Sequence, residues 1–124
     1  MRKKLTTVLL SAVVAGQALA ADWQHINTRP NAYGVANYTY VDSTSINGTT
    51  LRVMEIIKGG IHHGEYVQYI VQTDCSDYTM RTVSNLQWYD SSGNYLRETR
   101  PGKPDWQSPK SSKDKAVWMY MCTE

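Results

Sequence analysis

Apolar and polar residues alternate along much of the chain after residue 36. In the segment 65–75, Val67, Tyr69 and Val71 fall on one side, and the other side carries Gln68, Gln72 and Asp74 together with Tyr66 and Ile70. This period of two is typical of a half-buried β-strand. We expect a central strand whose apolar side, which Cys75 shares, faces the core.

Other segments are also rich in aromatic and β-branched residues, which favour strands. Asn47-Gly48 predicts a tight hairpin between two of them, because both residues tolerate positive φ. Short turns between successive strands indicate an antiparallel sheet. With the central one, about six strands are expected; the other five lie near Trp23 and at 38–46, 51–57, 78–89 and 95–99.

The end of the chain changes to a helical period. Apolar residues recur at i, i+3 and i+4 between Ala116 and Met121. We predict a short helix over about 112–121, capped by Ser111 or Ser112. The expected fold class is α+β: an antiparallel sheet of about six strands with a short C-terminal α-helix packed on one face.

The first 20 residues have the pattern of a secretory signal peptide. Basic residues at 2–4 precede an apolar run, and Ala18-Leu19-Ala20 provides small residues for cleavage. A membrane anchor needs about 20 apolar residues, and polar residues interrupt this run. We expect a signal peptide over 1–20 and a single domain over 21–124, exported to the periplasm, the cell surface or the medium.

Removal of the signal peptide would change the charge of the chain. Lys and Arg fall from 13 to 10 while Asp and Glu stay at 11, so the formal net charge changes from +2 to −1. This balance argues against general nucleic-acid binding, which needs a basic surface. A local excess of positive charge remains at the C-terminal end, where an acidic protein ligand or a glycan sulfate could bind. The simpler interpretation is that these charges belong to a solvated helix face and loop. The candidate ligand-binding residues are Arg97, Arg100, Lys103, Lys110, Lys113 and Lys115.

The chain has two cysteines, Cys75 and Cys122. Disulfides persist in exported proteins, and two cysteines allow one intramolecular pairing. We predict that this pair forms a disulfide, which would stabilise the domain by about 4 kcal/mol. Two buried free thiols or an intermolecular bond are the alternatives.

Few residues suggest chemistry. His62 and His63 attract attention as metal or haem ligands, but adjacent residues on an extended loop point to opposite sides. Asp42, Asp74 and Asp77 lie in polar segments typical of Asx turns. Neither a nucleophile elbow, a zinc-protease motif nor a phosphate-binding loop is present. We therefore expect neither enzyme activity nor a cofactor.

The aromatic composition is unusual, with nine tyrosines, four tryptophans and no phenylalanine. Tyr and Trp provide large contact area with a polar tip, which suits an interaction surface. In a domain this small, most of them are nevertheless expected in the core, and we expect Trp106 to fill the core from its loop.

Several blocks of the chain resemble the surface-adhesin protein E family of Gram-negative bacteria. These blocks are Trp23, Tyr40–Ile46, Arg52–Glu55, Asp74-Cys75, Trp106 and Ala116–Cys122. The resemblance extends over nearly all of the chain after residue 20. It implies an antiparallel sheet of about six strands and a C-terminal helix held by the cysteine pair. For the best-known type of member it also implies adhesion to host laminin, vitronectin and plasminogen.

The expected function is therefore that of a small exported binding protein, a monomer or homodimer, with a protein ligand. In the family this role belongs to an outer-membrane lipoprotein, whereas Ala18-Leu19-Ala20-Ala21 contains no cysteine for acylation. One alternative is a periplasmic structural or envelope-maintenance protein without a host ligand. A second alternative is metal or haem binding through His62 and His63.

Overall fold

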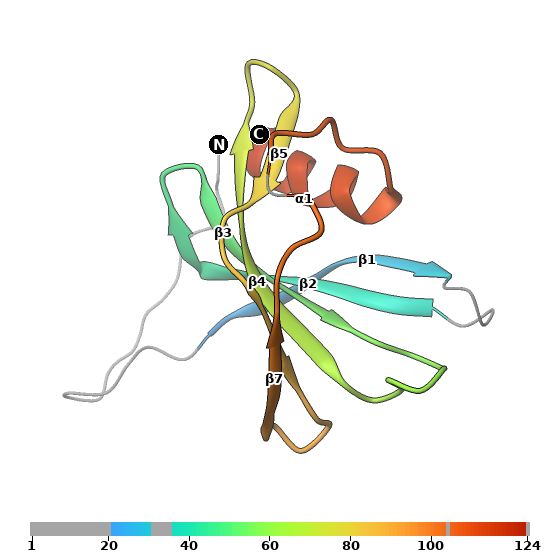
Figure 1. Cartoon of the computed structure of the whole chain (residues 1–124). Helices are drawn as coiled ribbons and strands as arrows, with labels where there is room; N and C mark the ends of the chain where they lie inside the picture. The colour runs from blue at the N-terminus through green and yellow to red at the C-terminus, as the bar shows by residue number, and fades with distance from the viewer. Residues whose placement is uncertain (1–20, 31–35, 104, 124) are drawn as a thin grey trace.

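The computed structural model describes residues 21–30, 36–103 and 105–123 (Figure 1). The expected signal peptide lies outside these residues. The described chain forms one antiparallel sheet of seven strands and a C-terminal helix, which confirms the α+β prediction. The elements are β1 (Trp23–Pro30), β2 (Ala36–Asn47), β3 (Thr50–Ile56), β4 (Tyr66–Asp74), β5 (Thr79–Thr82), β6 (Leu86–Tyr89), β7 (Tyr95–Thr99) and α1 (Ser112–Cys122).

The strands follow the order β1-β2-β3-β4-β6-β7, and β5 pairs with β4 next to β6. All pairings are antiparallel. The sheet twists strongly, so that β1 and β2 cross the direction of β7 at a steep angle in Figure 1. The helix α1 packs against β1 and β4 on one face, which we call the helix side.

The predicted single strand over 78–89 is wrong, because the structure divides it into β5 and β6. The break lies opposite Ile70, whose carbonyl accepts a hydrogen bond from the Val83 N–H at 2.8 Å. The Ile70 N–H donates instead to the Ser84 side-chain hydroxyl at 2.8 Å. A side chain thus replaces a backbone acceptor, and the regular ladder stops and resumes beyond it.

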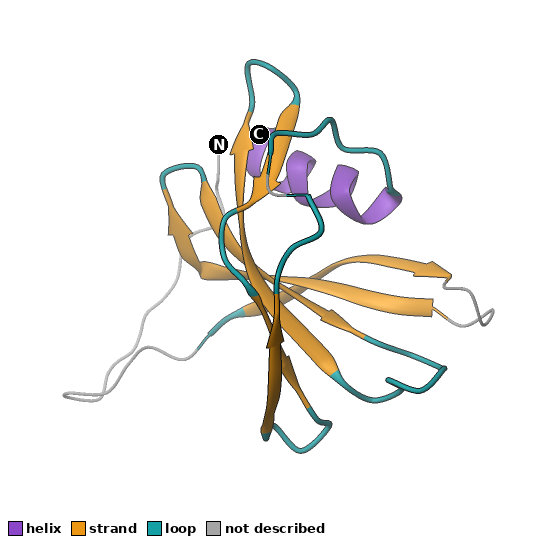
Figure 2. Cartoon of the chain, in the orientation of Figure 1, coloured by secondary structure: helices purple, strands orange, loops and turns teal. Residues whose placement is uncertain are grey.

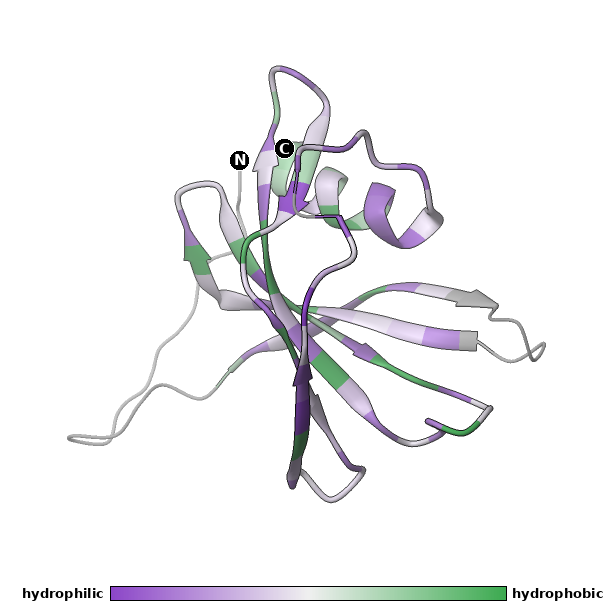
Figure 3. Cartoon of the chain, in the orientation of Figure 1, coloured by the Kyte–Doolittle hydropathy of each residue, from purple (hydrophilic) through white to green (hydrophobic). Residues whose placement is uncertain are grey.

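The core lies on the helix side of the central strands. The register places Val41 beside Val53 and Val53 beside Tyr69, and all three are buried. The helix adds Val117 and Met121 to this layer. Figure 3 shows the corresponding alternation of hydrophobic and hydrophilic residues along the strands, and the hydrophilic first turn of α1. The predicted core face of β4 is confirmed for Val67, Tyr69 and Val71, whereas Cys75 lies beyond the strand and is exposed.

The N-terminus of α1 is capped, as the sequence predicts. Of the two candidate residues, Ser111 is the cap. Its hydroxyl accepts a hydrogen bond from the Asp114 N–H at 3.1 Å. Such a cap stabilises a helix by about 1 kcal/mol. Asp114 also places a negative charge in the first turn, where the helix dipole favours it.

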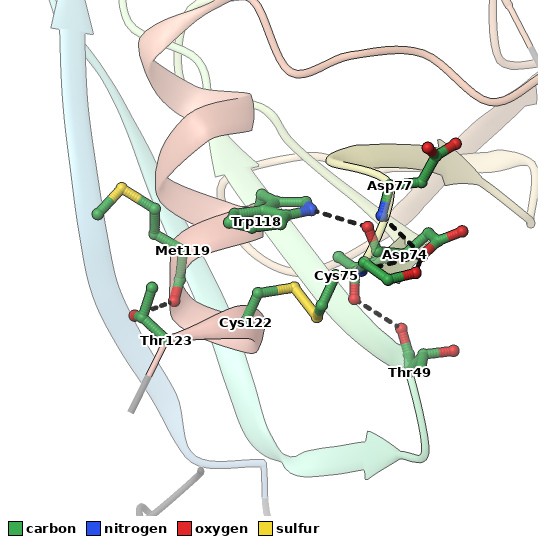
Figure 4. The surroundings of a disulfide bond; sticks show 10 residues. Thr49, Asp74, Cys75, Asp77, Trp118, Met119, Cys122 and Thr123 are labelled. Atoms are coloured by element: carbon green, nitrogen blue, oxygen red, sulfur yellow. Dashed lines mark hydrogen bonds between the residues drawn. A yellow bond between two sulfur atoms is a disulfide. The ribbon is translucent and has the colours of Figure 1, made fainter.

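The disulfide between Cys75 and Cys122 is present, as predicted (Figure 4). It joins the turn after β4 to the last residue of α1, and the two Cα atoms are 5.4 Å apart. Beside it, the Trp118 indole N–H donates to the Asp74 carbonyl at 3.4 Å. The end of the helix is therefore fastened to the end of the central strand.

The prediction that Trp106 fills the core is wrong. Its side chain is 40% exposed, and the Arg81 guanidinium lies over its ring, 4.6 Å from the centroid. The next residue, Gln107, exchanges two backbone hydrogen bonds with Met80, of 2.8 and 2.9 Å. This bridge holds the segment after β7 at the edge of β5, so Trp106 covers an arginine on the surface.

Candidate binding surface on the helix-free face

The second face of the sheet carries no helix in the part of the chain that the structure describes. We call it the helix-free face (Figure 2). Cross-strand pairing aligns Tyr38 with Ile56, Ile56 with Tyr66, Tyr66 with Tyr89, and Tyr89 with Tyr95. Each pair shares one face of the sheet. Four tyrosines and one isoleucine thus form a line across five strands, which we call the tyrosine row.

Three of the four rings of the tyrosine row lie in contact. Tyr66 and Tyr89 are stacked, with centroids 5.1 Å apart, and Tyr95 meets Tyr89 edge to face at 5.9 Å. Tyr38 is 37% exposed and Tyr95 is 56% exposed. These contacts restrain the rings of Tyr66, Tyr89 and Tyr95, so this part of the surface would lose little conformational entropy on binding.

The prediction that most tyrosines lie in the core is wrong. Among the tyrosines that the structure describes, Tyr69 alone is buried. The reason is the period of two: Tyr69 shares a face with Val67 and Val71, whereas Tyr66 falls on the opposite face. Because α1 covers one face only, tyrosines whose side chains lie on the opposite face are open to solvent.

A groove of about 470 Å³ adjoins the tyrosine row on the helix-free face. Most of the residues that line it are polar, and Gln68 and Gln87 are paired across its floor. Tyr89 and Ile70 supply its apolar surface. The groove therefore offers amide groups beside an aromatic ring, a combination suited to the polar surface of a protein ligand.

Arg52 lines this groove, and contacts with Asp42 and Trp23 hold its side chain in place. Its guanidinium lies 3.6 Å from a carboxylate oxygen of buried Asp42 and 6.0 Å from the centre of the Trp23 ring. The other oxygen of Asp42 accepts hydrogen bonds from the backbone of Asp22 and Thr44, both at 3.0 Å. The bond to Thr44 is the predicted Asx turn, which here positions a charge at the groove.

Of the predicted basic residues, Arg97 is engaged within the chain. Its guanidinium forms an ion pair with Glu65 at 2.8 Å and lies over the Trp88 ring, 4.6 Å from the centroid. The structure describes Arg100, Lys103, Lys110 and Lys115 as exposed. Arg100 lines a separate hollow beside the break between β5 and β6.

Lys113 points from α1 toward the sheet. Its ammonium lies 3.6 Å from a Glu55 carboxylate oxygen and donates to the Tyr69 hydroxyl at 3.2 Å. Burial alone would lower the pKa of Lys113, but Tyr69 and Glu55 together raise it above its ordinary value. Burial also raises the pKa of the Tyr69 hydroxyl, against the opposing effect of Lys113. This predicted binding residue thus ties the helix to the sheet.

The two loop histidines have partners within the chain. Nδ1 of His62 lies 3.2 Å from both Arg97 and Glu65, and Nδ1 of His63 accepts from the Gly59 N–H at 2.6 Å. Among the described residues, no three His, Cys, Asp or Glu side chains are grouped where they could hold a metal ion.

Asp74 behaves as a turn residue, as predicted. One oxygen of its carboxylate accepts from the backbone N–H groups of Ser76 and Asp77, at 3.1 and 3.2 Å.

In the described part of the chain, no helix has the length and apolar character needed to cross a membrane. The fold defines a small disulfide-bonded α+β domain. Comparison with protein-family models, curated proteins and solved structures finds no match to the chain. The resemblance to the adhesin family therefore stays a prediction.

Proposed function

We propose that this protein is an exported binding protein that recognises a protein ligand through the helix-free face of its sheet. The observation that carries the proposal is the tyrosine row, which spans five strands of a face that no described helix covers. Tyrosine supplies rigid contact area and a hydroxyl, and it is enriched where interfaces gain most of their affinity. The proposal assigns the protein no catalytic role and no cofactor.

The proposed partners are host extracellular-matrix and serum proteins, with laminin, vitronectin and plasminogen as the first to test. Support comes from the resemblance of residues such as Trp23 and the block Tyr40–Ile46 to the surface-adhesin protein E family. In the fold, Ser45 and Arg52 line the groove and Trp23 lies beside the Arg52 guanidinium, so part of the resembling sequence adjoins the proposed surface.

Substitution of two tyrosines tests the surface. Purified protein with an intact disulfide should bind at least one of immobilised laminin, vitronectin and plasminogen saturably at physiological salt. The double variant Tyr66→Ser, Tyr95→Ser should bind at least tenfold more weakly, a loss of about 1.4 kcal/mol. Biolayer interferometry measures both affinities.

Met119→Ser is the matched control, because Met119 is 54% exposed on α1, outside the sheet. It should leave the affinity unchanged. Equal affinities for the tyrosine variant and the wild type would refute the proposed surface, and absence of saturable binding to all three proteins would refute these partners.

The proposed role also requires the protein to reach the cell surface or the medium. Protease added to whole cells should then remove the protein. Protection until the outer membrane is opened would instead support the alternative, a periplasmic role in the structure or maintenance of the envelope.

A further inference from the structure

A second hollow, of about 790 Å³, lies where β5 ends and β6 begins. Residues 81–85 line one side of it, and Arg100 and Pro101 line the other. Figure 2 shows the two loops concerned, the link from β5 to β6 and the segment that leaves β7. We call it the arginine hollow, because Arg81 and Arg100 converge on it from these two parts of the chain.

Neither arginine of the hollow is neutralised by the described residues. Arg52 and Arg97 elsewhere in the sheet pair with carboxylates at 3.6 and 2.8 Å. Arg81 and Arg100 form no ion pair with any carboxylate that the structure describes. Two positive charges thus face one open hollow, and no described carboxylate is paired with either of them.

Arg81 is also held in place before any ligand arrives. Its Nε donates to the Gln72 side-chain carbonyl at 2.9 Å, and its guanidinium lies on the Trp106 ring. The bridge between Met80 and Gln107 in turn fixes the segment that carries Trp106. Both supports are uncharged, so they orient the guanidinium while its charge stays available. Such preorganisation lowers the entropic cost of binding.

We infer that the arginine hollow binds a sulfated glycan chain. A guanidinium presents paired N–H groups that match the oxygens of a sulfate or a carboxylate. Two arginines on separate segments suit an anion-bearing chain better than a single ion. Thr82 and Asn85, which also line the hollow, offer a hydroxyl and an amide for sugar hydroxyl groups.

The inference concerns a different site from the tyrosine row and does not rest on the proposed protein ligand. The arginine hollow and the groove share Ser84 and Asn85 as a common wall. Residues 21–124 carry a formal charge of −1. Binding of a polyanion therefore has to arise from a local site and not from general basicity.

Isothermal titration calorimetry with a heparin octasaccharide tests the inference. The wild type should bind saturably, and Arg100→Gln should weaken binding at least tenfold. The variant Arg81→Gln should weaken it similarly, and the double variant should abolish it. Each removed arginine should also reduce the slope of log K against log salt by about one.

Lys115→Gln is the control, because it removes the same charge from an exposed position on α1. It should change the affinity less than twofold. Arg100 is exposed and forms no hydrogen bond, ion pair or ring contact with the residues that the structure describes, so Arg100→Gln should fold normally. Its thermal unfolding should match that of the wild type, whatever the result for Arg81→Gln. Absence of saturable octasaccharide binding, or an equal loss in Lys115→Gln and Arg100→Gln, would overturn the inference. Equally tight binding of a hyaluronan octasaccharide, which carries carboxylates only, would overturn the assignment to sulfate.

Discussion

Lys113 carries a positive charge into the contact between α1 and the sheet. Its side chain is 18% exposed and lies against Glu55 and Tyr69. Glu55 also accepts a hydrogen bond from the Asn37 amide at 3.3 Å, so the carboxylate has a second polar partner. A buried charge is tolerated only when it is paired and hydrogen-bonded in this way. The cluster therefore fixes how the helix sits on the sheet.

The raised pKa values of Tyr69 and Lys113 predict a loss of stability at high pH. Both groups hold their protons more tightly in the folded protein than in the unfolded chain. Their contribution to stability is therefore fully present below about pH 10 and is lost as the pH rises through their folded pKa values. Urea unfolding between pH 9 and 11.5, roughly spanning these ordinary values, should show a falling free energy of unfolding.

Tyr69→Phe should make this alkaline loss smaller, since the variant cannot ionise at that position. Tyr95→Phe, at an exposed position, should lose stability with pH as the wild type does. An alkaline loss in Tyr69→Phe as large as that in the wild type would contradict the assignment.

The helix α1 depends on its attachments. It has 11 residues, of which Val117 and Met121 are buried. Helices shorter than about 12–15 residues are marginal on their own in water. The disulfide, the Trp118 bond to Asp74 and the Lys113 cluster supply the missing stability. The helix is therefore expected to be the first element to loosen when the disulfide is removed.

Replacement of both cysteines, Cys75→Ser with Cys122→Ser, tests this dependence. The free energy of unfolding should fall by about 4 kcal/mol. Amide hydrogen exchange should accelerate more in α1 than in β3 and β4, which remain paired in the sheet. Uniform acceleration through all elements, or none, would show that the disulfide does not anchor the helix specifically.

At the level of elements, the sequence predicts features that depend on neighbouring residues. It does not predict features that depend on contacts between distant segments. The hairpin between β2 and β3 and the Ser111 cap follow from local chemistry, and both are present, although the turn residues are Gly48 and Thr49 and of the predicted pair only Gly48 has a positive φ. The break between β5 and β6 depends on Ser84 meeting Ile70 of another strand. Likewise, nothing beside Trp106 in the sequence shows that Arg81 will cover its ring.

At the level of the whole molecule, the sheet has two different faces. One is closed by α1 and the disulfide, and the other carries the tyrosine row and the groove. The period of two predicts which residues of one strand share a face. It does not predict which tyrosines align across strands, because bulges such as that between Trp88 and Tyr89 set the register. The surface could therefore be recognised only once the strands were paired.

Photo-crosslinking tests most directly whether a protein ligand binds the helix-free face. A benzoyl-phenylalanine placed at Tyr38 or Tyr95, the two most exposed positions of the tyrosine row, should crosslink to bound laminin, vitronectin or plasminogen. The same group at Met119 on α1 should not. Crosslinks from Met119 with none from the tyrosine row would contradict the account.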